Sequence, residues 1–244
     1  MRKNVIILTS GLSGSSILTG LIARAGYWTG DETFRKVEYN TNENQELIDL
    51  NLKLFAEAGY KGNYLLEFSP AAMNAIAALA GKTGLDPYRS FIAKCDAHRP
   101  WIWKDPRLWL TIRFWKNLLD LDQCTFILLT RGVMQSWISS TLRRQITTYR
   151  YSKQYEQNIK QSAVDFLKEN GLPYLSLSYE ELIQRPAETI ERLNRHLGSD
   201  LTIEDLGKVY HKPLYKNPRN SFVKHIKAVL IYLKNYSERL DNAA

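Results

Sequence analysis

The sequence predicts an α/β fold with a central parallel sheet flanked by helices, because apolar strand-like runs alternate with segments of helical periodicity. Residues 124–130 are almost all apolar or β-branched, which is typical of a strand buried on both faces. A second apolar run at residues 5–8 leads into a Gly/Ser-rich loop and then a helical pattern. We therefore expect a single domain spanning residues 1–244.

The first half of the chain is expected to alternate between the two kinds of element. The pattern predicts strands at 4–9, 64–68 and 101–105, and helices at 15–26, 44–58, 71–80, from 86 onward and at 106–119. Residues 29–44 are polar and show no strong periodicity, and residues 81–84 are expected to form a loop.

The second half completes the predicted core. The pattern predicts strands at 125–130 and 173–178, and helices at 132–145, 156–169, 180–197 and 222–240. Pro186 cannot sit inside an undisturbed helix, so we expect a break near Gln184. The aromatic and basic stretch 147–155 is expected to form a mobile loop over a site. The last helix is amphipathic and carries several lysines, and we expect it to pack on the core.

Composition narrows the class of ligand. The net charge of +8 favours an anionic ligand, a nucleic acid or an acidic surface, although solubility alone is an alternative explanation. Basic residues are spread along the chain rather than gathered in a tail, so we expect no nucleic-acid partner. Cys95 and Cys124 are too few for a disulfide framework. No stretch approaches the ~20 apolar residues of a membrane span, and we expect a cytoplasmic protein.

Two strand ends carry residues suited to phosphate. Arg131 follows the strand at 125–130, at the edge where open α/β sheets bind ligands, and Ser139 lies eight residues further on in a helix. A cation and a hydroxyl so placed can hold one phosphate. At the end of the first strand, a loop offers backbone N–H groups at a helix start, which is electropositive. The loop consists of Ser13, Gly14, Ser15 and Ser16. An ordinary Ser/Gly turn, a surface arginine and a helix serine are the alternatives.

Four segments together resemble sulfotransferases that use 3′-phosphoadenosine-5′-phosphosulfate (PAPS), of the bacterial type with a Lys-Asp-Pro-Arg segment. They are Ser13-Gly-Ser-Ser16, Lys104-Asp-Pro-Arg107, the pair Arg131 and Ser139, and Tyr179-Glu-Glu-Leu-Ile-Gln-Arg-Pro186. The resemblance implies a P-loop-like three-layer fold. It also implies transfer of a sulfonate from PAPS to a hydroxyl, or as a second choice an amine, with release of 3′-phosphoadenosine-5′-phosphate (PAP). The acceptor would be a small molecule, a glycan or a lipid.

The resemblance also assigns donor-binding roles. The loop at 13–16 would cradle the 5′-phosphosulfate, Arg131 and Ser139 would bind the 3′-phosphate, and Tyr179 opens the segment after the last core strand. Arg219, in Lys216-Asn-Pro-Arg219, resembles in place a basic segment over the 3′-phosphate, with a solvated basic turn as the alternative.

One position departs from the family. Leu12 stands where members usually carry the Lys or Arg that meets the bridging oxygen of the donor. Another cation then does this work, or the loop aligns differently, or catalysis is impaired. The candidate cations are Lys104, Arg107, Arg24 and Arg35.

Three carboxylates compete for the role of base. Asp105 beside Lys104 is the first candidate, although an Asp before a proline also commonly caps a helix. Glu43 is the second, because Glu43-Asn44 resembles a Glu-Asn pair of bacterial members, and Glu67 is the third. Weaker candidates are Asp31, Glu32, Glu38 and His98, with Trp28 as a contact for the acceptor or the nucleotide. No residues have metal-ligand spacing, and the reaction class needs no metal.

Two other functions remain open at this stage. The segment Gly11-Leu-Ser-Gly-Ser-Ser16 resembles the beginning of a kinase P-loop, but the Gly-Lys pair that contacts the β- and γ-phosphates is missing. A relative that binds PAPS or PAP without turnover is the other alternative, and Leu12 is its motivation.

Overall fold

The computed structural model describes residues 2–37, 39–82, 84–210 and 218–241, the last range with side chains from Phe222 onward. Its centre is a parallel sheet with the strand order β4-β1-β5-β6. The strands are β1 (Asn4–Thr9), β4 (Ile102–Lys104), β5 (Cys124–Thr130) and β6 (Tyr174–Ser178). In register, Ile7 of β1 lies between Lys104 of β4 and Ile127 of β5. The predicted α/β fold with a central parallel sheet flanked by helices is confirmed.

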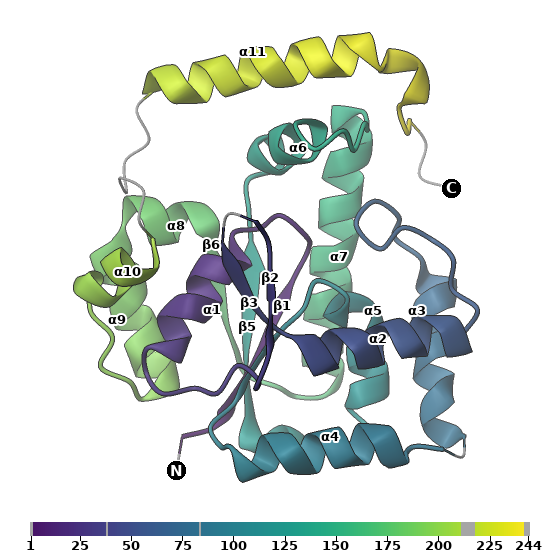
Figure 1. Cartoon of the computed structure of the whole chain (residues 1–244), viewed down its shortest axis with the longest axis vertical. Helices are drawn as coiled ribbons and strands as arrows, with labels where there is room; N and C mark the ends of the chain where they lie inside the picture. Colours follow the sequence, from purple (N-terminus) through teal and green to yellow (C-terminus); the bar gives the residue numbers. More distant parts are fainter. Residues whose placement is uncertain (1, 38, 83, 211–217, 242–244) are drawn as a thin grey trace.

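The pleat of β1 explains the three layers. Successive side chains of a strand point to opposite faces, so Val5 and Ile7 enter one apolar cluster and Ile6 and Leu8 enter another. The first cluster is completed by α1 (Ser15–Ala23), α8 (Tyr179–Gln184), α9 (Pro186–Leu197) and α10 (Ile203–Val209). The second is completed by α2 (Gln45–Glu57), α3 (Pro70–Ala78), α4 (Asp86–Ala97), α5 (Leu108–Trp115) and α7 (Tyr149–Glu169). Helices therefore cover both faces of the sheet (Figure 1).

The predicted break in the helix at 180–197 is confirmed. Gln184 ends α8 and Pro186 begins α9, where its missing N–H costs nothing. Ser178 opens α8 with a capping box, in which its side chain accepts from the Glu181 N–H and the Glu181 side chain accepts from the Ser178 N–H. The chain thus turns sharply at the end of β6, as the predicted strand and helix require.

Two local predictions were wrong, and one region without a predicted element is structured. Residues 64–66 form a turn and residues 67–68 are irregular, instead of the predicted strand, because the Asn63 side chain accepts from the Leu65 N–H and its carbonyl accepts from two further amides. Residues 149–155 are the start of α7 instead of a loop, since Tyr151 and Tyr155, one turn apart, are both buried. The polar region 29–44 contains an antiparallel hairpin, β2 (Thr33–Arg35) and β3 (Asn40–Asn44).

The last helix, α11 (Pro218–Lys234), lies beside α6 (Val133–Thr141) at one end of the molecule (Figure 1). Ala228 and Tyr232 pack against Trp137 and Ile138 of α6. After α11, the Leu240 backbone is hydrogen-bonded to residues 146 and 148. Within the described residues, no helix is long and apolar enough to span a membrane.

Candidate active site

The four parallel strands end at one edge of the sheet, and the candidate residues follow those ends. Thr9 closes β1, Lys104 closes β4, Thr130 closes β5 and Ser178 closes β6. The loop after β1, the pair Lys104 and Asp105, Arg131 and Tyr179 are therefore brought to the same edge, where α/β sheets bind their ligands. The structure therefore brings together segments that the sequence analysis assigned to the donor and to catalysis.

The loop after β1 presents the start of α1 without a protein cap. Gly14 is the N-cap residue in a left-handed conformation (φ 78°), and among the described residues no side chain caps it. The first amides of a helix have no intrahelical acceptor, and together with the helix dipole they attract anions. Thr9 anchors the loop by donating a 2.5 Å hydrogen bond to the buried hydroxyl of Ser13. The start of α1 therefore has free amides that can bind an anion.

Glycine is required at position 14 for a second reason. A Cβ atom there would overlap the ring of Tyr179, which packs directly against the loop. Burial raises the pKa of this tyrosine, so its hydroxyl stays neutral at physiological pH. Tyr179 thereby defines one wall of the candidate donor site.

Arg131 is a half-buried cation that forms no ion pair with a described carboxylate. Its Nη1 donates to the Leu12 carbonyl at 2.7 Å, and its guanidinium lies 4.9 Å from the centre of the Tyr179 ring. Its Nε is buried without a hydrogen-bond partner, and within the described ranges no Asp or Glu forms an ion pair with it. Burial lowers the pKa of Arg131. A half-buried cation without an ion pair has lost part of its hydration, and a bound anion would offset that cost.

The other predicted donor residues are less clearly placed. Ser139 is half-buried on α6. An open pocket beside Gly11 and Leu12 is lined by Ser136 and Ser140 of the same helix, and Ser139 is not among its lining residues. Arg219 belongs to the first turn of α11, but its side chain and the whole of Lys216 lie outside the described residues.

Lys104 forms a buried ion pair with Glu43. Its Nζ lies 2.5 Å from Glu43 Oε1 and 3.3 Å from the hydroxyl of Ser16. The side chains of Lys104 and Glu43 are 1% and 11% exposed. Removal from water lowers the pKa of Lys104, and the Glu43 carboxylate opposes this shift. The Lys104 ammonium therefore contacts the first turn of α1, which directly follows the loop.

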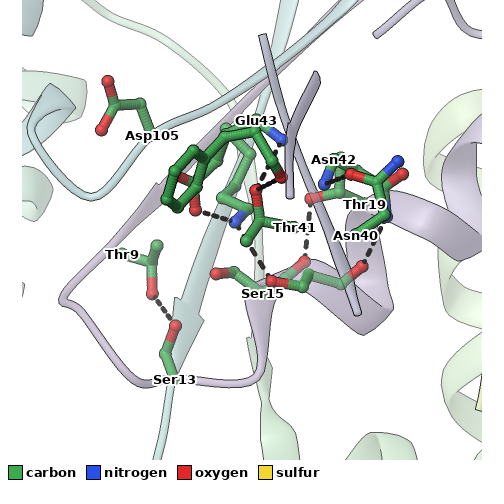
Figure 2. Close-up of polar contacts among 12 residues, drawn as sticks. Thr9, Ser13, Ser15, Thr19, Asn40, Thr41, Asn42, Glu43 and Asp105 are labelled. Carbon is green, nitrogen blue, oxygen red and sulfur yellow. Dashed lines mark hydrogen bonds and ion pairs between the residues drawn. The ribbon is translucent and has the colours of Figure 1, made fainter. Parts of the chain in front are cut away.

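Glu43 reaches this position because its hairpin lies against α1. The side-chain amide of Asn42, at a left-handed φ of 55°, donates to the Ser16 carbonyl at 3.2 Å. Asn44 then caps α2 by accepting from two amides of its first turn. Figure 2 shows Thr41, Asn42 and Glu43 facing the start of α1. The hairpin thus fixes the carboxylate between β4 and the helix.

Asp105 is held in a different network. Its Oδ2 accepts from Asn51 at 2.8 Å, and its Oδ1 accepts from the Arg107 backbone and guanidinium at 2.9 and 2.8 Å. The residue is fully buried, and its carboxylate points away from Glu43 (Figure 2). The Arg107 guanidinium also lies over the ring of Tyr64, 4.6 Å from its centre. Asp105 therefore fixes the turn that leads into α5, but the N-cap of this helix is Arg107 and no side chain caps it, so the expectation that Asp105 caps the helix before an N1 proline was wrong.

Most of the weaker candidates are engaged elsewhere. Arg24, at the far end of α1, pairs with Asp205 at 3.5 Å, and Asp31 pairs with Lys94 at 2.9 Å. The remaining candidates are placed as follows: His98 stacks on Trp28 at 4.7 Å, Arg35 and Glu32 are exposed on or beside β2, Glu67 is exposed after the turn at 64–66, and Glu38 lies outside the described residues. Among the described residues, no group of three or more His, Cys, Asp or Glu side chains could hold a metal ion.

Sequence reasoning missed Glu156. This residue of α7 lines the pocket beside Leu12, and its carboxylate accepts a 2.6 Å hydrogen bond from Ser10, the first residue of the loop. Burial raises its pKa, while nearby Arg131 acts in the opposite direction. The signal for it is the helical spacing of Tyr151 and Tyr155, which shows that α7 has begun before Glu156.

Comparison with solved structures identifies two sulfotransferase domains. The domain from the Synechococcus PCC 7002 olefin synthase has a TM-score of 0.55 and 20% sequence identity, over 87% of this chain and 78% of that domain. The domain from the curacin biosynthetic pathway has a TM-score of 0.52 and 19% identity, over 89% of this chain and 81% of that domain. No family model and no curated protein matches the sequence. The chain therefore has a sulfotransferase-like fold.

Proposed function

We propose that this protein is a sulfotransferase that moves a sulfonate group from PAPS to a hydroxyl of its acceptor. The observation that carries the proposal is the meeting of two anion-binding features at one edge of the sheet. The uncapped start of α1 at Gly14 and the half-buried cation of Arg131, whose Nε is buried without a hydrogen-bond partner, are joined through the Leu12 carbonyl. Two solved structures with a similar fold are sulfotransferase domains, and this similarity supports sulfonate transfer at this edge.

The donor fits what these residues offer. The amides and hydroxyls at 13–16 would hold the 5′-phosphosulfate, as helix starts commonly hold phosphate. The guanidinium of Arg131, with its unused Nε, would bind the 3′-phosphate in a bidentate manner. The ring of Tyr179 backs both groups and excludes water from that side.

The transfer would use the pair of Lys104 and Glu43. The acceptor oxygen forms a bond to sulfur while the bond from sulfur to the 5′-phosphate oxygen breaks, and that oxygen leaves with the electron pair as part of PAP. Glu43 takes the proton of the acceptor hydroxyl, and a positioned base of this kind typically contributes about 10²–10⁴-fold. Lys104, which contacts the helix start through Ser16, stabilises the charge that develops on the leaving oxygen.

Lys104 would also replace the basic residue that is missing at position 12 as the cation near the bridging oxygen of the donor. Of the other candidate cations, Arg107 is bound to Asp105 and Arg24 is paired at the far end of α1. Lys104 is the candidate whose ammonium contacts the helix start, from the neighbouring strand.

The donor site is tested by isothermal titration calorimetry. We expect PAP to bind tightly, whereas AMP, which lacks the 3′-phosphate, and ATP with Mg²⁺ bind weakly. Arg131→Gln should weaken PAP binding at least tenfold, since charge-assisted hydrogen bonds contribute roughly 1.5–3 kcal/mol. Arg195→Gln, which removes an arginine that is 71% exposed on α9, is the matched control and should bind normally. Equal affinity for AMP and PAP would refute the proposal, and preference for ATP with Mg²⁺ would favour a kinase.

Turnover is tested separately, by measuring PAP release from PAPS in the presence of hydroxyl and amine acceptors drawn from small molecules, glycans and lipids. An active enzyme should lose this release in Glu43→Gln while keeping its affinity for PAP. Tight PAP binding without release for any acceptor would instead indicate a binding protein that has lost transfer.

A further inference from the structure

The outer face of α11 is apolar and exposed. Phe222, Ile226, Leu230 and Leu233 are between 45% and 67% exposed, and their spacing places them on one stripe of the helix. The helix contacts α6 through Ala228 and Tyr232, which lie on a different side. A contiguous exposed stripe of large apolar side chains marks an interaction surface.

The same helix is basic and carries no acidic residue. Lys224, Lys227 and Lys234 are exposed, and no Asp or Glu occurs between Phe222 and Lys234. Lys227 and Lys234 are seven residues apart, so they lie on one side of the helix and border the apolar stripe. Lysine stems can lie along an apolar surface while their ammonium groups reach outward to anions.

We propose that this face of α11 binds an anionic lipid bilayer, with the apolar stripe in the headgroup region and the lysines on lipid phosphates. An amphipathic helix with a lysine border lies in the plane of a membrane interface, and each basic residue near an anionic surface adds to the attraction. Charge complementarity favours a bilayer over a second copy of the chain. Pairing two copies would bring the lysines of one stripe close to those of the other, between molecules that each carry a net charge of +8.

The position of α11 is compatible with such contact. The helix lies at the end of the molecule where α6 begins, on the outside of the fold (Figure 1). Backbone bonds of Leu240 to residues 146 and 148 tie the segment after α11 to the body of the protein. The apolar stripe can therefore contact a flat membrane surface while α11 stays attached to the rest of the protein.

The test is flotation of the full-length protein with vesicles of phosphatidylcholine alone or mixed with phosphatidylglycerol. We expect binding to the mixed vesicles that falls as salt is added, and little binding to the neutral ones. Leu230→Asp should reduce binding roughly tenfold, and the double variant Lys227→Glu with Lys234→Glu should do the same. Leu52→Asp, at an apolar side chain that is 43% exposed on α2, is the matched control and should bind like the wild type.

Three results would overturn the proposal: no binding to mixed vesicles, equal binding to both vesicle types, or unchanged binding by Leu230→Asp. Analytical ultracentrifugation adds a fourth, a dimer that Leu230→Asp dissociates and that does not bind vesicles, which would assign the stripe to a second copy. Titration of PAP into the same variants tests the donor site independently, because none of these substitutions touches it.

Discussion

Replacing Lys104 by methionine tests the buried pair at the centre of the candidate site. Methionine keeps most of the length of the lysine stem but removes the charge, so the Glu43 carboxylate loses the ammonium 2.5 Å away. Since the two side chains are only 1% and 11% exposed, little water can replace the missing partner. We expect a strong loss of stability from this single change.

The size of the loss follows from two opposing terms. At 2.5 Å, Coulomb's law with an effective dielectric constant of about 20 gives an attraction of about 7 kcal/mol. Desolvation of two ions offsets this by several kcal/mol, so the intact pair contributes little net stability. Removing one partner leaves the other ion desolvated and alone, which typically costs about 3–5 kcal/mol.

Urea unfolding at neutral pH measures this cost, and a double-mutant cycle assigns it. Adding Glu43→Gln to Lys104→Met should recover most of the lost free energy of unfolding, because no unpaired ion remains. Lys94→Met is the matched control, since Lys94 forms ion pairs of 2.8 and 2.9 Å at a largely exposed site, where water can replace the lysine. If the double variant is no more stable than Lys104→Met alone, the two residues do not act as a coupled pair.

Three further predictions concern Gly14 and Glu156 at the site and His196 at the opposite edge of the sheet, where β5 begins. Gly14→Ala should abolish PAP binding measured by calorimetry, because its Cβ overlaps the Tyr179 ring and its φ is 78°; unchanged affinity would exclude the loop as a donor site. Burial raises the pKa of Glu156, so its contribution to stability is present below pH 4.5 and is lost as pH rises through its folded-state pKa. Glu156→Gln, which can still accept from Ser10, should therefore be more stable than the wild type in urea at pH 7, with no advantage at pH 4.5; a less stable variant at pH 7 would contradict this. Burial lowers the pKa of His196, so its contribution is present above pH 6.5 and is lost as pH falls through its folded-state pKa. Comparison with His196→Gln should show a steeper loss of stability below pH 6.5 for the wild type, and parallel pH profiles would refute the assignment.

The sheet was predictable because its signals are local. The apolar runs in β1 and β5 are longer than a turn and are buried on both faces, so sequence alone places them inside. The ends of these strands then fix where Arg131 and the Gly14 loop emerge. In the same way Lys104 follows directly from the apolar residues of β4. This part of the candidate site needs no knowledge of tertiary contacts.

The choice of the base could not be made from sequence. Asp105 and Glu43 were both candidates, and Asp105 is the immediate neighbour of Lys104. Their surroundings differ because Asn51 of α2 and Arg107, two residues after Asp105, occupy both oxygens of Asp105. Glu43 depends on a short polar hairpin whose strands lack apolar alternation, so its position over α1 comes from tertiary contacts alone.

Two errors came from treating aromatic residues as loop signals or strand signals. In residues 64–68 the apolar pattern resembles a strand, but the Tyr64 carbonyl accepts from the buried Trp109 ring and from the Tyr155 hydroxyl, which fixes a turn. The tyrosines at 151 and 155 have the spacing of one helical turn, which the polar residues between them obscured. In both segments the side chains are used for packing around the site.

The register of β1 against β4 gives a physical reason why Leu12 can be tolerated in the proposed enzyme. Ile7 pairs with Lys104, so the end of β4 lies beside the strand that feeds the loop. A cationic side chain on β4 is attached to the backbone of a sheet strand. A cationic side chain at position 12 would instead be attached to a loop residue with a left-handed φ of 65°. The β4 position also couples the cation to Glu43, so the group that stabilises the leaving oxygen directly contacts the base. On this proposal, moving the positive charge from the loop to the strand joins the two functions of sulfonate transfer in one buried pair.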